Sequence, residues 1–170
     1  MKIDDSITID RIKLLHPKLR EEALDMYREM NEAISHNVIL RFAYTIRTFS
    51  EQDGLYALGR SKPGKVVTNA KGGDSYHNYG LAFDIVLLID KDNNGTYETA
   101  SWDTLTDFDH DGISDWKEVV NIAKQYGYEA GIDWKFVDAP HFQKTFGYSV
   151  KQLLKLFTDK KVDEHNYVKI

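Results

Sequence analysis

The sequence predicts a single α+β domain in which a mainly antiparallel sheet is flanked by helices. The chain has 170 residues, a length that fits one compact domain with a proper core. Its apolar content of 42% and aromatic content of 12% are those of a globular protein. Segments with helical periodicity lie toward both ends, and β-rich runs lie between them. We expect one domain over residues 1–170, with its core at about 10–157.

The N-terminal part predicts a long helix followed by a strand. Residues 10–36 carry apolar side chains at i, i+3 and i+4 spacing, and Pro17 suits the first turn of a helix. The run VILRFAYTI over 38–46 is rich in β-branched and aromatic residues, which is typical of a strand.

The next segments predict a short helix, a loop and a central strand. Ser50 is the expected N-cap of a helix that ends at Gly59. Residues 59–73 are rich in Gly and Lys and predict a loop. The apolar run 80–89 predicts the central strand.

The C-terminal half predicts two helices and short strands. Residues 90–98 are turn-like and precede a short strand. An amphipathic helix is expected over 115–127, a strand near PHFQ, and a last helix over 149–157. The segment NYVKI is a candidate edge strand.

Composition excludes several kinds of partner and site. The net charge is −5 without a long basic block, so we expect no nucleic-acid binding. There is no cysteine, so a transition-metal site would have to use histidine and carboxylate ligands. No segment approaches the ~20 apolar residues of a membrane span, and MKIDDSITIDRIKLL lacks the features of a signal peptide. We expect a monomer that is made in the cytoplasm without a leader of its own.

Asp84 lies inside an apolar run, where an unpaired carboxylate would be costly to bury. His77 and His141 lie in segments that are not amphipathic helices, so no helix face explains them. A catalytic zinc takes three protein ligands and leaves one position for water, and these three residues would supply such a set. Asp138, three residues before His141, could then act as general base and later as general acid.

Each residue also has an ordinary structural explanation. His77 could be a loop histidine bonded to backbone, and His141 could be a residue at a sheet edge. Asp84 could be a buried aspartate paired with an arginine such as Arg47. The coincidence of the three in one short chain favours the metal site.

Four separate motifs resemble a known family. S-x-H-x6-D followed by a late P-H-F resembles the D-Ala-D-Ala metallopeptidases and the hedgehog-like zinc fold. Between about residue 10 and about residue 157, the chain is similar to the L-alanyl-D-glutamate peptidases, a group that includes phage endolysins and bacterial cell-wall hydrolases. The motifs are RFAYTIRTFSEQDGLYALGR, TNAKGGDSYHNYGLAFDIVL, SWDTLTDFDHDGISDWKEVV and GIDWKFVDAPHFQ.

The resemblance implies roles for individual residues. His77, Asp84 and His141 would bind zinc, and Asp138 would be the catalytic base, although many members of the wider superfamily have Glu there. Arg47 would lie over the site and stabilise an oxyanion or a substrate carboxylate.

Three further positions match the substrate pocket of the family. Gln52 and Ser75 match positions next to the metal. Trp134 would form a wall of the site, or it would be an ordinary core aromatic.

Residues 107–118 fit the calcium-binding loop of an EF-hand position by position. The alternative is a solvated acidic turn whose last acidic residues cap the following helix. The expected ligands at positions 1, 3, 5, 7, 9 and 12 are Asp107, Asp109, Asp111, the carbonyl of Ile113, Asp115 and Glu118, with Gly112 at position 6.

Calcium in this loop would help to position Asp138 and His141, so activity would depend on it. A second segment, 90–101, begins like a calcium loop but has Ser101 in place of the bidentate Glu. A hairpin turn is therefore the better interpretation there.

Together these features predict a zinc metallopeptidase that cleaves the L-Ala-D-Glu bond of peptidoglycan stem peptides. The bond preference comes from the resemblance alone. The alternatives are a D-Ala-D-Ala carboxypeptidase or dipeptidase on the same fold, and a non-catalytic module that binds calcium or cell wall. Without a leader, the enzyme would reach the wall as an endolysin does, through a separate membrane pore.

Overall fold

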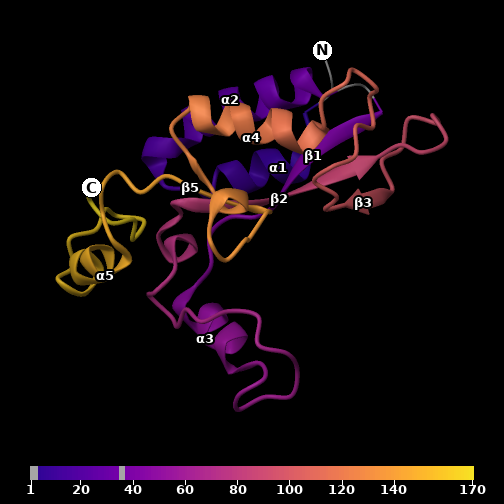
Figure 1. Cartoon of the computed structure of the whole chain (residues 1–170). Coiled ribbons are helices and arrows are strands. Elements are labelled where there is room, and N and C mark those ends of the chain that lie inside the picture. Colours follow the sequence, from indigo (N-terminus) through magenta and orange to yellow (C-terminus); the bar gives the residue numbers. More distant parts are fainter. Residues whose placement is uncertain (1–3, 35–36) are drawn as a thin grey trace.

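The computed structural model describes residues 4–34 and 37–170, and they form one antiparallel sheet with helices around it (Figure 1). The strand order is β1–β2–β5–β4, and β3 pairs with the second half of β2. The strands are β1 Val38–Tyr44, β2 Ala82–Ile89, β3 Thr99–Ser101, β4 Glu129–Ala130 and β5 His141–Gln143. The helices are α1 Ser6–Ile12, α2 Arg20–Ala33, α3 Phe49–Ala57, α4 Asp115–Gln125 and α5 Val150–Thr158, with 3-10 turns η1 Pro17–Leu19, η2 Tyr76–Tyr79 and η3 Gly131–Asp133.

One face of the sheet forms the core. In Figure 1, α1, α2 and α4 lie together along this face, whereas α3 and the loop after it project from the opposite side. Three aromatic rings cross the sheet beneath the helices. Phe83 stacks on Phe42 of β1 at 4.2 Å between centroids and on Phe142 of β5 at 5.4 Å. All three rings are fully buried, so they tie β1, β2 and β5 into one packed layer.

The same strand pairing places polar residues on the other face. Phe83 is directly opposite Phe142, and the neighbouring pair in the ladder is Asp84 and His141. Because successive strand residues point to opposite faces, a pair next to two core phenylalanines must point away from the core. The partly buried aspartate of the apolar run therefore belongs to the second face of the sheet.

A β-bulge in β1 brings a further aromatic residue to that second face. Residues 38–42 pair with β2 in regular register, and the register then shifts so that Tyr44 is opposite Asp84. If the pairing continued without this shift, the alternation would turn Tyr44 toward the core. The bulge re-aims the end of β1, which leads directly into Arg47.

The predicted helix over 10–36 is wrong as a single element, because the chain is helical over α1 and α2 with a break between them. The break lies at His16, whose ring accepts a hydrogen bond from the backbone N–H of Lys18, and Pro17 begins η1. α1 also begins before residue 10, at Ser6 with Asp5 as its N-cap. Residues 35–36 of the predicted helix lie outside the described residues.

Most other predicted elements are confirmed, with two corrections. The cap of α3 is Thr48 and not Ser50, because Thr48 and Glu51 form a reciprocal capping box. The segment NYVKI does not join the sheet; Val168 makes one isolated bridge to Val162 instead. The two-residue strand β4 was not predicted from the sequence. Within the described ranges, no helix is long and apolar enough to cross a bilayer.

Candidate active site

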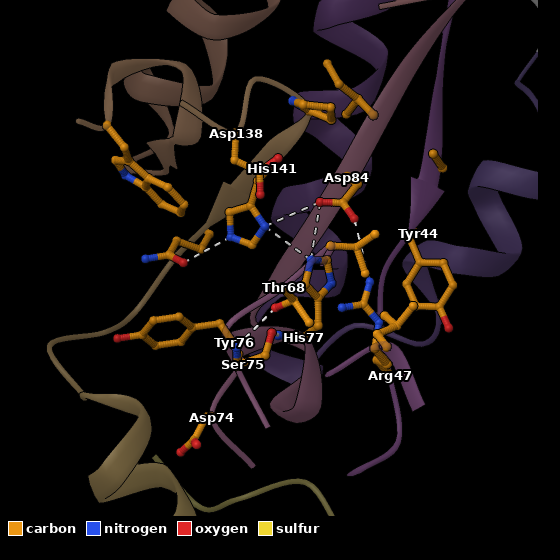
Figure 2. A pocket seen from close by; sticks show the side chains of 18 of the residues that line it. Tyr44, Arg47, Thr68, Asp74, Ser75, Tyr76, His77, Asp84, Asp138 and His141 are labelled. Atoms are coloured by element: carbon orange, nitrogen blue, oxygen red, sulfur yellow. Dashed lines mark hydrogen bonds and ion pairs between the residues drawn. The ribbon is translucent and has the colours of Figure 1, made fainter. Parts of the chain in front are cut away.

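Three side chains from separate segments meet on the second face of the sheet. The distance between His77 Nε2 and His141 Nδ1 is 3.2 Å, and each of these atoms lies 3.3 Å from Asp84 Oδ1 (Figure 2). His77 comes from η2, Asp84 from β2 and His141 from the start of β5. The structure thus brings together the three residues predicted as zinc ligands.

The hydrogen bonds behind the two histidines leave both inner nitrogens without a proton. His77 Nδ1 lies 2.6 Å from the carbonyl oxygen of Thr45, which can only accept, so this nitrogen carries the hydrogen. His141 Nε2 lies 3.0 Å from the side-chain oxygen of Gln143 and must donate for the same reason. In the neutral rings, two lone pairs and a carboxylate oxygen therefore face one another, and only a cation can satisfy them.

The spacing of these donors is compatible with zinc. For zinc–nitrogen and zinc–oxygen bonds of about 2.0–2.1 Å, neighbouring donors of a tetrahedral shell lie about 3.3–3.4 Å apart. The three observed separations, 3.2, 3.3 and 3.3 Å, are those of one tetrahedral face. The residues present therefore fit a zinc ion with three protein ligands.

The electrostatics of the three side chains also favour a bound cation. Burial acts to raise the pKa of Asp84, but hydrogen bonds and charges from His141 and His77 outweigh it and hold the pKa well below its usual range. Burial acts to lower the pKa of His141, yet Asp84 raises it above the ordinary value. Asp84 is therefore ionised, and protons compete with a metal for the histidines.

Local hydrogen bonds fix the segment that carries His77. Ser75 caps η2 by accepting a hydrogen bond from the His77 N–H, and Asn78 completes the capping box. The amide of Asn78 also donates to the backbone oxygen of Arg47. Ser75 therefore supports His77 through the backbone, and its predicted contact with substrate stays a prediction.

Arg47 lies beside the candidate metal ligands. Its guanidinium packs over the ring of Tyr44 at 4.7 Å, and its Nη2 lies 3.9 Å from Asp84 Oδ2. Gln52 accepts a hydrogen bond from Arg47 Nη1 and donates to the carbonyl of Ala70, so it fixes both the arginine and the loop. Gln52 is only 1% exposed, which makes support of Arg47 its visible role, and its predicted contact with substrate stays a prediction.

Asp138 is exposed and reaches the site from the loop before β5 (Figure 2). The backbone holds this loop from two sides, because the N–H of Asp138 donates to the carbonyl of Gly131 and its carbonyl accepts from the N–H of His141. A Cβ at Gly131 would lie 2.3 Å from the carbonyl oxygen of Asp138. The close approach therefore requires glycine.

A cleft of about 910 Å³ opens over the candidate metal ligands and is also lined by Asp138, Arg47 and Ser75. Trp134 forms part of its wall, with its ring centroid 5.1 Å from that of His141. The side chain is partly exposed, so it is a wall residue and not a core aromatic. Trp102, which is 55% exposed, lines the same cleft and was not predicted from the sequence.

The acidic loop before α4 forms a second cluster. Carboxylate oxygens of Asp107, Asp109 and Asp111 lie within 4.8 Å of one another, as do those of Asp109, Asp115 and Glu118. Gly112 has φ of +99°, as the sharp turn at position 6 requires.

Two carboxylate oxygens of this loop are buried and lack a hydrogen-bond partner within the described ranges. They are Oδ1 of Asp115 and Oε2 of Glu118. Burial and the neighbouring acidic residues raise the pKa of Glu118 to about 7. Ser114 and not Asp115 is the N-cap of α4, so the capping alternative does not explain these oxygens.

Sequence reasoning missed the residues that orient the ligands. Thr45 acts through its backbone carbonyl, so its side chain carries no signal. Gln143 lies two positions after His141, and this spacing is that of one face of a strand, a signal that could have found it.

The site also agrees with the comparisons with known proteins. A family model described as D-alanyl-D-alanine carboxypeptidase matches residues 68–144, a range that includes all three candidate zinc ligands. The chain is 44% identical over 130 residues to the peptidoglycan L-alanyl-D-glutamate endopeptidase CwlK of Bacillus subtilis, covering 76% of this chain and 72% of that protein.

A solved structure supports the fold. The crystal structure of the Serratia marcescens L-Ala D-Glu endopeptidase ChiX matches with a TM-score of 0.52 and 22% identity, covering 83% of this chain and 88% of the other. This likeness concerns the fold, whereas the sequence identity to CwlK shows that the chain belongs to the L-alanyl-D-glutamate peptidase group of the D-alanyl-D-alanine carboxypeptidase family.

Proposed function

We propose that this protein is a zinc-dependent endopeptidase that cleaves the L-Ala-D-Glu bond of peptidoglycan stem peptides. The observation that carries the zinc is the convergence of two unprotonated imidazole nitrogens and one carboxylate oxygen at 3.2–3.3 Å. The bond specificity is supported by the name and the identity of the Bacillus subtilis relative.

The residues of the cleft have different roles in the proposed hydrolysis. His77, Asp84 and His141 would hold zinc, which supplies Lewis acidity toward the scissile carbonyl and lowers the pKa of water to about 7. Asp138 takes a proton from the attacking water and delivers it to the leaving amine as the C–N bond breaks. Arg47 lies beside the ligands and stabilises the negative charge that develops on the carbonyl oxygen.

The test of this function combines metal analysis with mass spectrometry of digested stem peptides. We expect about one zinc per chain and a product with a new N-terminal D-Glu. Release of free D-Ala instead would favour the carboxypeptidase alternative.

Asp138→Ala separates catalysis from binding. We expect the variant to keep its zinc and its melting temperature but to lose hydrolysis by at least about 100-fold, the usual contribution of a general base. Asp133→Ala, on the exposed turn that precedes the same loop, is the control and should remain active. Full activity of Asp138→Ala would exclude its role as base.

We also propose that the acidic loop binds calcium and thereby supports the active site. The supporting observation is the pair of buried carboxylate oxygens on Asp115 and Glu118 that lack partners in the described residues. The loop leads into α4, which is followed by β4, and β4 pairs with β5 next to His141. A cation in the loop would offset the mutual repulsion of its carboxylates and order the start of α4.

Calcium titration of chelator-treated protein tests this second proposal. We expect binding with a rise in melting temperature, and Glu118→Gln should weaken both effects because it removes the bidentate ligand. Asp92→Asn, in the exposed turn over 90–98, is the control and should bind as the wild type does. Unchanged turnover after selective calcium removal, with zinc retained, would contradict a role in activity.

A further inference from the structure

We propose that Glu129 and Gln143 form a positioning pair that sets the tautomer of His141, so that its Nδ1 stays free to bind the metal. The inference rests on the proposed zinc site and adds two residues outside the predicted ligand set. Within the described residues, their side-chain hydrogen bonds lead to His141 and not to His77 or Asp84, so both would act through His141.

Strand pairing places these residues in a row. His141 and Gln143 are two positions apart on β5 and therefore share a face of the sheet. Asp84 of β2 is the partner of His141, and Glu129 of β4 is the partner of Gln143. The second face of the sheet thus carries a continuous polar path from β4, through β5, to the metal ligands on β2.

The direction of each hydrogen bond in this path follows from Glu129. An ionised carboxylate only accepts, so the contact of 2.9 Å between Glu129 and the side-chain nitrogen of Gln143 must be a donation from the amide. This fixes the amide orientation and turns the oxygen of Gln143 toward His141 Nε2, at 3.0 Å. The imidazole must then carry its hydrogen on Nε2, which leaves the Nδ1 lone pair facing Asp84 and His77.

Without either Glu129 or Gln143, the Nε2–H tautomer of His141 would no longer be favoured. If the amide of Gln143 were free to flip, it would present a nitrogen donor to His141 and favour the hydrogen on Nδ1. A hydrogen there would lie among the three metal donors, at a position that the metal needs. Gln143 is only 8% exposed, so water has little access to take over its role.

The first measurement uses the metal-free protein labelled with ¹⁵N-histidine, at a pH at which the rings are neutral. We expect long-range ¹H–¹⁵N spectra to show the Nε2–H tautomer of His141 in the wild type and a mixture in Gln143→Met. The second measurement is zinc affinity by competition with a chromogenic chelator. Gln143→Met should bind zinc about 10- to 100-fold more weakly, as other losses behind metal ligands do. Gln125→Met, at the exposed end of α4, is the matched control and should bind as the wild type does.

An exchange of the two side chains distinguishes positioning from simple packing. In the double variant Glu129→Gln with Gln143→Glu, a carboxylate at 143 accepts both from His141 and from the new amide at 129. We expect zinc affinity to return to within a few-fold of the wild type, whereas Gln143→Met stays weak at an unchanged melting temperature.

The exchange and the spectra also separate this inference from the proposed function. Failure of the double variant to rescue zinc affinity, or an Nδ1–H tautomer in the wild type, would overturn the positioning role. The tautomer is read without zinc or substrate, so it decides the inference even if the wild type fails to hydrolyse stem peptides.

Discussion

Gly131 controls where the proposed base Asp138 lies, although its own side chain is a single hydrogen. The carbonyl of Gly131 accepts a hydrogen bond from the N–H of Asp138. A methyl group in place of the glycine Cα hydrogen would lie 2.3 Å from the carbonyl oxygen of Asp138. Gly131→Ala must therefore push the loop outward. We expect kcat to fall by about 100-fold, because displacement by about 1 Å can cost that much.

The matched control for this prediction is Gly54→Ala. Gly54 lies within α3, and no atom of the described residues beyond its chain neighbours and the backbone of its own helix would lie within 4 Å of a Cβ at this position. Alanine should leave kcat unchanged and stabilise the protein by about 0.5–1 kcal/mol, since glycine is unfavourable within a helix. Equal activity of the two variants, measured on the same stem peptide, would contradict a positioning role for Gly131.

At this scale, the sequence could reveal the residues that carry chemistry but not those that hold them. His77, Asp84 and His141 stand out because each is unusual in its segment. The roles of Gln143 and Glu129 depend on which strands pair and in which register, and a two-residue strand such as β4 has no periodicity from which to predict it.

At the scale of elements, α3 shows how a capping signal can be assigned to the wrong residue. Ser50 and Thr48 are both able to cap, and each is followed by an acidic residue three positions later, Asp53 and Glu51 respectively, so this spacing does not distinguish them. In the structure, the carboxylate of Glu51 accepts a hydrogen bond from the Thr48 N–H and so completes the capping box.

The two candidate caps give a direct test. Thr48→Ala should lower the free energy of unfolding by about 1 kcal/mol, because it leaves the Glu51 N–H without its acceptor. Ser50→Ala, inside the first turn, should change it by less than about 0.5 kcal/mol. Chemical denaturation of both variants measures the difference, and a larger loss for Ser50→Ala would favour the prediction from sequence.

The bulge in β1 is a second feature that the sequence did not predict. Burial alternates regularly over 38–42, and the same alternation continued to residue 44 would place Tyr44 in the core. Only the observed pairing with β2 shows the shift that turns Tyr44 toward Asp84 and under Arg47. The strand could be predicted from its composition. The face of the sheet on which its last residue, Tyr44, lies depends on the pairing with β2.

At the scale of the whole molecule, the two faces of the sheet separate stability from chemistry. The phenylalanine stack and the helices α1, α2 and α4 bury one face, and the candidate metal ligands occupy the other. The fold class and the order of most elements could be predicted because hydrophobic periodicity is local. Contacts between residues far apart in the sequence could not be predicted in this way. The contact between the two ends of the chain is the clearest example.

That contact depends on a neutral histidine. His16 is 4% exposed, its Nε2 lies 2.9 Å from the carbonyl oxygen of Val168, and its Nδ1 accepts from Lys18. Tyr167 adds a hydrogen bond to the carbonyl of Leu14. Burial lowers the pKa of His16 below its ordinary value of 6.5, and the hydrogen bond to Val168 only partly opposes this.

A lowered pKa fixes the sign of the pH dependence. The unfolded chain binds a proton at His16 more readily than the folded chain, so this contribution to stability is complete above pH 6.5 and is lost as the pH falls toward the folded-state pKa. We expect His16 to lower the free energy of unfolding over this range, whereas Glu118 and His141, whose pKa values are raised, act in the opposite direction. His16→Gln, which keeps a donor to Val168 but cannot titrate, should lose less stability than the wild type as the pH falls. His165→Gln, on an exposed histidine, should retain the wild-type slope. Parallel profiles for His16→Gln and the wild type would show that the join between the chain ends does not depend on a neutral imidazole.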